Sequence, residues 1–327
     1  MKALVTGATG FVGGKLVTRL LEKGWKVKAF VRRGSSFSKL KKEKNLEVVV
    51  GDISDFDSLK KAVTGVDVVF NCAASLPYHN LPKRKYWEVN VDGTRNLMVA
   101  CLMNKVKRVV YISTVGIYGT TSRKGKSEKS KYKLTDVYSK TKYEGEKIVW
   151  KYIKKGVPVT IIKPTIAYGP TDTRPGFLNL FILIKKGVYP LVGKGNNFFH
   201  TIYIDNLIDS LLLAATKKSA VGEDFIIGDD PCPTMGLIVE TISEIQGRKP
   251  KAFYLPIWLA YLVGILFNLL QYAGLPAPLT TRRVDFMTQN KKFIIGKSKK
   301  VLGYVPKISL EEGLRRTFKW YKEKGYL

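Results

Sequence analysis

The chain is poor in the residues that bind transition metals. Among its 327 residues there are only two histidines, His79 and His200, and three cysteines, Cys72, Cys101 and Cys232. Neither histidine has a second histidine at ligand spacing, and the cysteines do not cluster, so nothing supports metal catalysis. Unclustered cysteines are typical of a reducing compartment, where they serve as small buried hydrophobic residues.

Acidic residues are scarce as well. Only 26 Asp and Glu stand against 56 Lys and Arg, a formal net charge of +30. This excess predicts attraction to something anionic: a phosphorylated cofactor, an acidic substrate, nucleic acid or an anionic membrane surface. The sequence has no recognisable nucleic-acid module and no aromatic residues interleaved with the basic ones, so no specific nucleic-acid partner is expected.

Long apolar runs are missing, with one exception. No hydrophobic signal region precedes the first residues, so we expect a cytoplasmic protein. The segment 257–273 carries no charge, but Asn268 and Gln271 within it would be costly in hydrocarbon. Its two tyrosines and one tryptophan favour an interfacial position. Three interpretations stay open: a buried helix, an exposed helix that contacts lipid or an apolar substrate, and a membrane span.

The first half of the chain alternates apolar runs with amphipathic segments. Several of the runs are too apolar for a half-exposed sheet, which predicts an α/β fold built on a doubly wound parallel sheet. After Pro164, short strands and helices mix with Pro and Gly turns, which suggests a smaller, interleaved C-terminal lobe. The expected strands are Lys2–Thr6, Lys26–Val31, Leu46–Val50, Val66–Cys72, Arg108–Ser113 and Val157–Ile162, and the expected helices are Val12–Lys23, Ser58–Val63, Tyr86–Asn104 and Val137–Lys155.

A glycine-rich turn links the first strand to the first helix. Gly7, Gly10 and Gly13 have Gly-x-x-Gly-x-x-Gly spacing, which permits a tight turn and lets the backbone approach a pyrophosphate at the helix N-terminus. In this position the turn predicts dinucleotide binding and a Rossmann-like fold, with a purely structural turn as the alternative. The expected cofactor contacts in it are Gly7, Thr9, Gly10, Phe11, Val12 and Gly13.

The following strand ends supply groups for the rest of a dinucleotide. Where NAD sites commonly have an acidic residue, this chain has Arg32 and Arg33, which can grip a 2′-phosphate. NADP is therefore favoured over NAD, unless both arginines are only surface charges. Asp52 suits a carboxylate that accepts from the adenine amino group. The contacts expected here are Arg32, Arg33, Asp52, Ile53, Ala73 and Ala74.

Tyr138 and Lys142 lie four residues apart in an expected helix, so both groups can reach one small volume. A lone tyrosine titrates near pH ~10, and lowering its pKa by about three units needs roughly 4 kcal/mol of differential stabilisation. A neighbouring lysine cation supplies stabilisation of this kind. The pair suits removal of a proton from an alcohol while hydride leaves the same carbon. Alone, however, the spacing occurs by chance on many helices.

Taken in order, the motifs resemble the extended short-chain dehydrogenase/reductase family, of the NAD-dependent epimerase/dehydratase type. The resemblance covers nearly the whole chain. Any one motif could be chance, but the full order is highly specific. The motifs are Gly7–Gly13, Asp52-Ile53, Asn71–Ala74, Val89–Thr94, Ser113–Gly119, Tyr138–Lys142 and Lys163–Pro170.

The resemblance implies a role for particular residues. Tyr138 would be the catalytic acid/base, and Lys142 would bind the nicotinamide ribose and lower the pKa of Tyr138. Thr114 occupies the place of the family's hydroxyl residue that holds the substrate oxygen, and Ser113 is the second choice. Further implied cofactor contacts are Asn90, for which a helix-orienting role is equally open, and Pro164 and Thr165 beside the nicotinamide.

The substrate class is inferred from subgroup resemblance. Thr114-Val115-Gly116 lacks the acids that sugar-nucleotide dehydratases often carry, so dehydration is disfavoured. The segments 257–273 and 278–283 look most like the 3β-hydroxysteroid dehydrogenase subgroup, and the first half also resembles dihydroflavonol reductases. We therefore predict an NAD(P)-dependent oxidoreductase that interconverts a secondary alcohol and a ketone on a hydrophobic, steroid- or isoprenoid-like molecule.

Alternatives remain beside this prediction. A nucleotide-sugar 4-epimerase would use the same site with retained NAD, and Arg174 and His200 are its candidate substrate contacts unless they serve packing or the surface. A non-catalytic member would bind a membrane surface or nucleic acid. The nucleotide-binding domain is expected over residues 1–170, with 200–230 returning to it, and the substrate lobe over 171–327. Peripheral attachment to an anionic membrane and a homodimer are left open.

Overall fold

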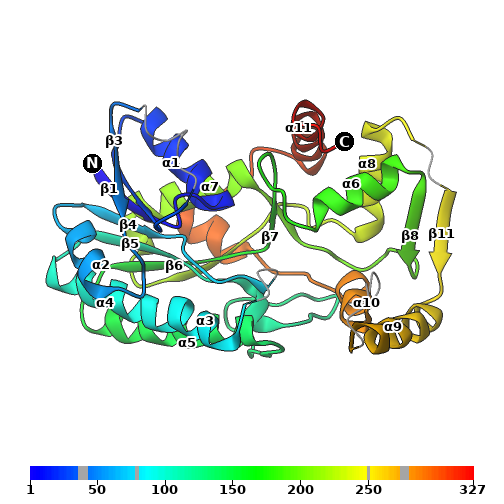
Figure 1. The fold of residues 1–327 in the computed structure, drawn as a ribbon, viewed down its shortest axis with the longest axis horizontal. Helices are drawn as coiled ribbons and strands as arrows, with labels where there is room; N and C mark the ends of the chain where they lie inside the picture. Colours follow the sequence, from blue (N-terminus) through cyan, green and yellow to red (C-terminus); the bar gives the residue numbers. More distant parts are fainter. Residues whose placement is uncertain (36–42, 78–80, 249–250, 273–279) are drawn as a thin grey trace.

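The computed structural model of the chain describes residues 1–35, 43–77, 81–248, 251–272 and 280–327. Within them, seven parallel strands form one sheet of order β10-β6-β5-β4-β1-β2-β3, which confirms the predicted doubly wound architecture (Figure 1). Its strands are β1 (Lys2–Thr6), β2 (Lys26–Val31), β3 (Leu46–Val50), β4 (Val68–Asn71), β5 (Arg108–Ile112), β6 (Val159–Pro164) and β10 (Asp224–Ile227).

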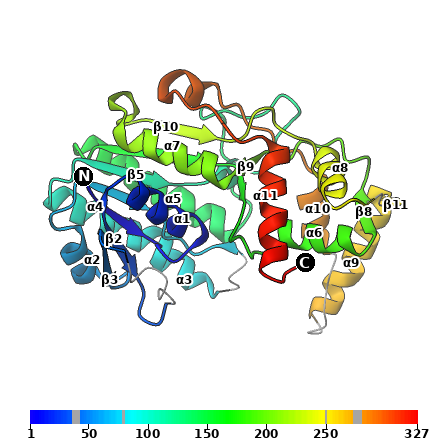
Figure 2. The ribbon, with the colours of Figure 1, turned by 90° about the horizontal axis from the view of Figure 1, so that it is seen from above.

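Helices cover both faces of this sheet (Figures 1 and 2). Both faces of the sheet are therefore buried. In β1, Leu4 and Val5 point to opposite faces, and both are fully buried, each in its own core cluster. This two-sided burial explains why the strands are continuously apolar. The covering helices are α1 (Phe11–Glu22) and α7 (Ile204–Thr216) on one face, and α2 (Phe56–Val63), α4 (Gly93–Met103) and α5 (Val137–Lys154) on the other.

The helix predicted over Tyr86–Asn104 is divided into three parts. The short helix α3 (Lys83–Trp87) leads into a π-helical turn, Glu88–Asp92, before α4 begins. The turn presents the carbonyl of Asn90 toward α5, where a Cβ atom on Gly145 would lie only 2.4 Å from the carbonyl oxygen. The predicted helix is therefore present, but its π-helical turn was not predicted, because this close contact between helices lies outside local sequence preference.

The rest of the described chain forms two small two-stranded sheets and a group of helices. One of these sheets and most of these helices lie at the end of the molecule remote from β3 (Figure 1). None of the helices in the described ranges combines the length and apolar character needed to cross a bilayer. The elements are β7 (Ile166–Tyr168) paired with β9 (Thr201–Tyr203), β8 (Val188–Val192) paired with β11 (Lys251–Leu255), and α6 (Phe177–Lys185), α8 (Met235–Ile245), α9 (Ile257–Tyr272), α10 (Thr281–Thr288) and α11 (Leu310–Glu323).

The chain crosses between the two regions more than once. After β9 it returns through α7 to β10, which pairs with β6 at the edge of the large sheet. Arg19 of α1 ties α7 to the first helix through Asp205 at 2.7 Å and Asp209 at 2.9 Å. The boundary expected near residue 170 stays a prediction.

Candidate active site

The turn between β1 and α1 is shaped by three glycines. Gly7 has a φ of +63°, a left-handed conformation that favours glycine. A Cβ atom on Gly13 would lie 2.2 Å from the carbonyl oxygen of Gly7, so the helix approaches the turn more closely than any side chain permits. Gly10 precedes α1 without a side-chain cap. The first amides of α1 therefore suit a pyrophosphate, and the turn fits a dinucleotide.

Arg32 and Arg33 lie at the carboxyl end of β2 and are exposed. With Asp52 they line a surface hollow of about 700 Å³. Asp52 accepts hydrogen bonds from the backbone N–H and hydroxyl of Ser54, at 2.9 and 2.6 Å. Partial burial alone would raise the pKa of Asp52, but the Ser54 bonds and the Arg32 charge hold it below its usual value. The hollow thus brings an ionised carboxylate and two guanidinium groups to the place where an adenosine 2′-phosphate is expected.

The end of β4 is fastened to the end of β1. Thr6 donates its hydroxyl hydrogen to Asn71 at 2.7 Å and accepts from the backbone N–H of Ala73 at 3.2 Å. Ala73 and Ala74 are half-buried beside the glycine turn, whose Gly7 closely approaches the backbone of Cys72 and Ala73. These small residues leave the backbone open to a ligand that crosses the carboxyl ends of β1 and β4.

Helix α5 begins immediately before the predicted acid/base residue. Asp136 accepts from the backbone N–H of Ser139 at 2.8 Å, and the Ser139 hydroxyl accepts from the backbone N–H of Asp136 at 3.1 Å. This capping box fixes where the first turn of α5 starts and hence where Tyr138 lies. The sequence Asp136–Ser139 therefore positions Tyr138 as well as starting the helix.

Thr114 and Tyr138 flank Gly116. A Cβ atom on Gly116 would lie 3.2 Å from Thr114 Oγ1 and 3.9 Å from Tyr138 Cε1. Thr114 Oγ1 accepts from the backbone N–H of Gly116 at 3.0 Å, and no acceptor for its own hydrogen is found among the described residues. The hydroxyl of Thr114 is thus oriented and can donate to a substrate oxygen.

Lys142 lies one turn further along α5 and is buried. Its ammonium group donates to the carbonyl of Ile112 at 2.6 Å and lies 4.6 Å from the centre of the Tyr111 ring. Burial lowers the pKa of Lys142 to about 8, while the nearby Glu146 and Cys72 oppose that decrease. Lys142 is therefore still a cation at neutral pH, which suits stabilisation of a tyrosine phenolate.

Thr165 follows β6 directly, where the nicotinamide is expected. Its hydroxyl oxygen is buried and has no hydrogen-bond partner within the described part of the chain. A buried unpaired hydroxyl is costly, and a ligand group beside Pro164 and Thr165 would satisfy it. The observation fits the expectation that the nicotinamide lies here. No three His, Cys, Asp or Glu side chains of the described residues are placed to hold a metal ion.

Comparison with known proteins agrees with this geometry. Residues 3–228 match the model of the NAD dependent epimerase/dehydratase family. The chain belongs to that family. It is 31% identical to the 3β-hydroxysteroid dehydrogenase/Δ5→4-isomerase of Mycobacterium tuberculosis, over 98% of this chain and 90% of the relative. It is 28% identical to the N-acetyl-α-D-glucosaminyl-diphospho-ditrans,octacis-undecaprenol 4-epimerase of Escherichia coli O157:H7, over 97% and 94%.

A solved structure gives the same fold. The UDP-glucuronic acid 4-epimerase of Bacillus cereus in complex with NAD superposes with a TM-score of 0.79 at 24% identity, over 99% of both chains. The protein is therefore an enzyme of a family of NAD-dependent dehydrogenases, reductases and epimerases, as the motif order predicted.

In this epimerase/dehydratase-family enzyme, Ser113 and Asn90 have structural partners. Ser113, the second choice for the hydroxyl role, is buried and donates to Glu146 at 2.7 Å. Asn90 accepts from the backbone N–H of Ser75 at 2.9 Å and donates to the Thr141 hydroxyl at 3.0 Å. Asn90 thus holds α5 beside Lys142, which is the helix-orienting alternative considered for it.

The two predicted substrate contacts are also engaged within the protein. Arg174 forms an ion pair with Asp172, donates to the carbonyl of Ala167 at 2.8 Å and lies 4.7 Å from the centre of the Phe11 ring. His200 is buried, with Nδ1 accepting from the backbone N–H of Phe293 at 3.2 Å and Nε2 bonded to the Asp229 carbonyl at 2.7 Å. Burial lowers the pKa of His200 to about 4, so it is neutral. Their contact with substrate stays a prediction.

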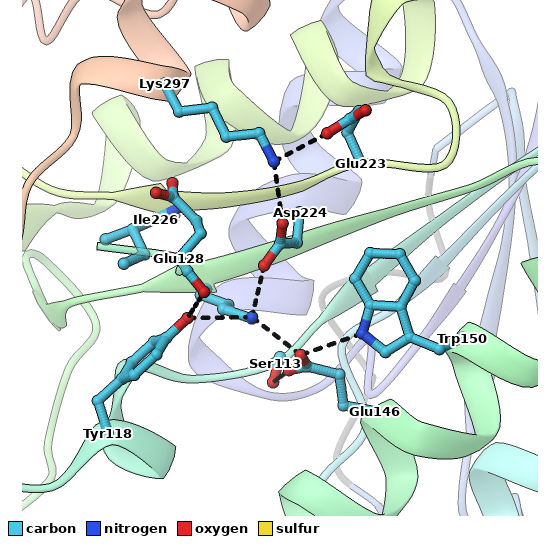
Figure 3. A network of polar contacts seen from close by, with 10 residues as sticks. Ser113, Tyr118, Glu128, Glu146, Trp150, Glu223, Asp224, Ile226 and Lys297 are labelled. Carbon is cyan, nitrogen blue, oxygen red and sulfur yellow. Dashed lines mark hydrogen bonds and ion pairs between the residues drawn. The ribbon is translucent and has the colours of Figure 1, made fainter. Parts of the chain in front are cut away.

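Sequence reasoning missed a buried polar network beside the site (Figure 3). Lys163 is fully buried on β6 and contacts Glu146 at 2.9 Å and Asp224 at 2.6 Å. One signal was available, because Glu146 follows Lys142 by four residues and so lies on the same face of α5. Asp224 is 61 residues beyond Lys163 in the chain, and nothing in the sequence pairs them.

Proposed function

We propose that this enzyme interconverts a secondary alcohol and a ketone on a hydrophobic, steroid- or isoprenoid-like substrate. The observation that carries the proposal is the arrangement of Thr114 and Tyr138 around Gly116, one helical turn from the buried Lys142 cation. In the oxidation direction the Tyr138 phenolate takes the alcohol proton, and the Thr114 hydroxyl holds the substrate oxygen. Lys142 stabilises the phenolate. Lys142 and the glycine turn Gly7–Gly13 would also hold the cofactor. When bound, the nicotinamide supplies the hydride acceptor or donor.

The test of this function is a panel of substrates with both cofactors. Steroid and isoprenoid alcohols and ketones are compared with UDP-sugars, each with NAD(H) and NADP(H), and the nicotinamide absorbance is followed. Many turnovers of free cofactor with a hydrophobic alcohol or ketone support the proposal. The second candidate, a sugar 4-epimerase, is favoured by the similarity to the Escherichia coli epimerase. It predicts interconversion of sugars with no net change of cofactor, and that result would replace the first proposal.

NADP is the proposed cofactor, because Arg32 and Arg33 border the hollow that contains Asp52. Replacing both arginines with alanine is expected to weaken NADPH binding by roughly 10- to 100-fold and NADH binding by less than about 3-fold, since charge-assisted bonds to the 2′-phosphate are lost. Titration of protein fluorescence with each cofactor measures the two constants. Lys26→Ala removes an exposed cation from the other end of β2 and serves as the control. Equal losses of affinity for both cofactors would refute the proposed contact of Arg32 and Arg33 with the 2′-phosphate.

We also propose that α9 attaches the enzyme to an anionic membrane surface. One side of α9 is strongly exposed and entirely apolar: Trp258, Leu262, Ile265, Leu266 and Leu269 are 52–65% exposed. Two polar side chains of α9 point the other way, because Tyr261 donates to Asp285 and Asn268 donates to Thr281 at 2.8 Å, both on α10. The hydrogen bond to Thr281 therefore offsets the desolvation cost expected for Asn268. The net charge of +30 adds attraction to anionic headgroups.

The double variant Leu262→Gln and Leu266→Gln tests this attachment. Each buried leucine contributes about 1.5–3 kcal/mol, so the variant is expected to bind phosphatidylglycerol vesicles at least about 10-fold more weakly than the wild type in flotation at low salt. Val305→Gln changes an equally exposed residue outside α9 and should bind like the wild type. Absence of wild-type binding, or a concentration-dependent dimer that the double variant abolishes, would show that lipid does not cover this face.

A further inference from the structure

A buried ion-pair network joins α5 to the edge of the large sheet (Figure 3). The Lys163 ammonium group on β6 contacts Glu146 Oε1 at 2.9 Å, Asp224 Oδ2 at 2.6 Å and the Tyr118 hydroxyl at 3.2 Å. Asp224 on β10 also binds Lys297 at 2.9 Å. Buried ion pairs often stabilise a fold little more than apolar residues of the same size would. The place of this one, next to the proposed active site, therefore suggests a second role.

Glu146 connects the network to the end of β5. Its Oε2 atom accepts from the Ser113 hydroxyl at 2.7 Å, while Oε1 faces Lys163. One turn earlier on α5, Lys142 donates to the carbonyl of Ile112 at 2.6 Å. Two successive turns of α5 thus bind two successive residues of the β5 end. The next residue in the chain is Thr114, so these two bonds set where Thr114 lies relative to Tyr138.

Glu146 also shares a face of α5 with Lys142, four residues further along the helix. Four residues of helix advance by about 6 Å, so Glu146 is one turn from Lys142 and two turns, about 12 Å, from Tyr138. Glu146 opposes the effect of burial on the pKa of Lys142, as does Cys72 to a smaller extent. The other titratable or charged groups facing Lys142 and Glu146 are Tyr111 on β5, Tyr132 before α5, and Lys163 on β6 with Asp224 behind it.

We propose that Glu146 is a positioning residue of the active site: paired with Lys163, it fixes the end of β5 against α5 through Ser113 and places a carboxylate one helical turn from the Lys142 ammonium group. This role rests on the Tyr138–Lys142 acid/base pair proposed above. Replacing the carboxylate with an amide removes a negative charge one helical turn from Lys142. Lys142 then loses its proton at lower pH and no longer stabilises the Tyr138 phenolate.

The experiment is a tyrosinate titration by near-ultraviolet absorbance, without substrate or cofactor. The wild type is expected to gain the absorbance of one tyrosinate between about pH 6 and pH 9, and Tyr138→Phe to lack it. In Glu146→Gln this step should move upward by at least about one pH unit, because the phenolate loses its cation. Glu146→Asp keeps the charge and should titrate close to the wild type, which a role in packing alone does not predict.

Asp224→Asn is the matched control. This substitution also removes a carboxylate that pairs with Lys163, but Asp224 contacts neither Ser113 nor Lys142. The melting temperature should therefore fall, while the pH at which Tyr138 titrates should not change. An unchanged titration in Glu146→Gln would overturn the proposal, as would an equal shift in Asp224→Asn. If the wild type shows no Tyr138-dependent step below about pH 9, the acid/base pair itself is wrong, and the role of Glu146 fails with it.

Discussion

Tyr138→Phe is expected to lower turnover by about 10²- to 10⁴-fold, because the variant loses the group that exchanges a proton with the substrate oxygen. The ring remains, and so do Thr114 and the Lys142 bond to the Ile112 carbonyl. Cofactor affinity should therefore stay within about 2-fold of the wild type, and the effect should appear in kcat rather than in KM. Steady-state kinetics with the best substrate, together with cofactor titration, measure both quantities.

The control for this variant is Tyr143→Phe. Tyr143 lies on the same helix, α5, and its ring packs against the ring of Tyr132 in a tilted arrangement, with centres 5.0 Å apart. Loss of its hydroxyl removes the same atom from a residue outside the site, so activity should be preserved. Substantial residual turnover in Tyr138→Phe would remove the acid/base assignment, and so would an equal loss in Tyr143→Phe.

Gly13→Ala is expected to weaken the binding of either cofactor by roughly 5- to 150-fold, which corresponds to about 1–3 kcal/mol of overpacking. The added Cβ atom would lie 2.2 Å from the Gly7 carbonyl oxygen and 2.8 Å from the Gly7 carbonyl carbon. These are backbone atoms, so the contact is relieved only if α1 moves away from the turn. That movement would displace the amides expected to meet the pyrophosphate. Fluorescence titration and melting temperature separate lost binding from lost folding.

Gly14→Ala supplies the comparison for Gly13→Ala. Its Cβ atom would lie 3.4 Å from the Ala8 carbonyl oxygen, at the edge of ordinary contact. Alanine is also the better helix former, by up to about 1 kcal/mol. Gly14→Ala should therefore bind cofactor like the wild type and melt no lower. If Gly13→Ala behaves in the same way, the close approach at the turn is not needed for binding.

The sequence predicted six of the seven strands of the sheet, all but β10, because burial on both faces leaves a simple pattern. The first three strands begin and end where they were predicted, and the segment that returns as β10 was expected near 200–230. The π-helical turn Glu88–Asp92 was not predictable in this way. It accommodates the contact between the Asn90 carbonyl and Gly145, residues that meet only when α4 and α5 pack together.

The same distinction, between features set by local sequence and features formed only by packing, applies to the active site. The glycine turn and the Tyr138–Lys142 pair were predictable because their spacing within one element determines their geometry. Glu146, Lys163 and Asp224 come from three different elements, so their network emerges only in the folded protein. The orientation of α9 is a third case. Its uncharged sequence left a buried helix, an exposed helix and a membrane span open. The contacts of Tyr261 and Asn268 with α10 leave Leu262, Leu266 and Leu269 exposed.

Hydride is expected to pass between a free nicotinamide cofactor and a carbon of a hydrophobic substrate. The most direct test supplies NADPH deuterated at the transferred position together with the best ketone of the panel, and examines the alcohol product by mass spectrometry. The proposed oxidoreductase predicts one deuterium in each product molecule over many turnovers, and with Tyr138→Phe about 10²- to 10⁴-fold less deuterated product in the same time. Product without deuterium, or sugar epimerisation in which external deuterium never enters the product, would contradict the claim.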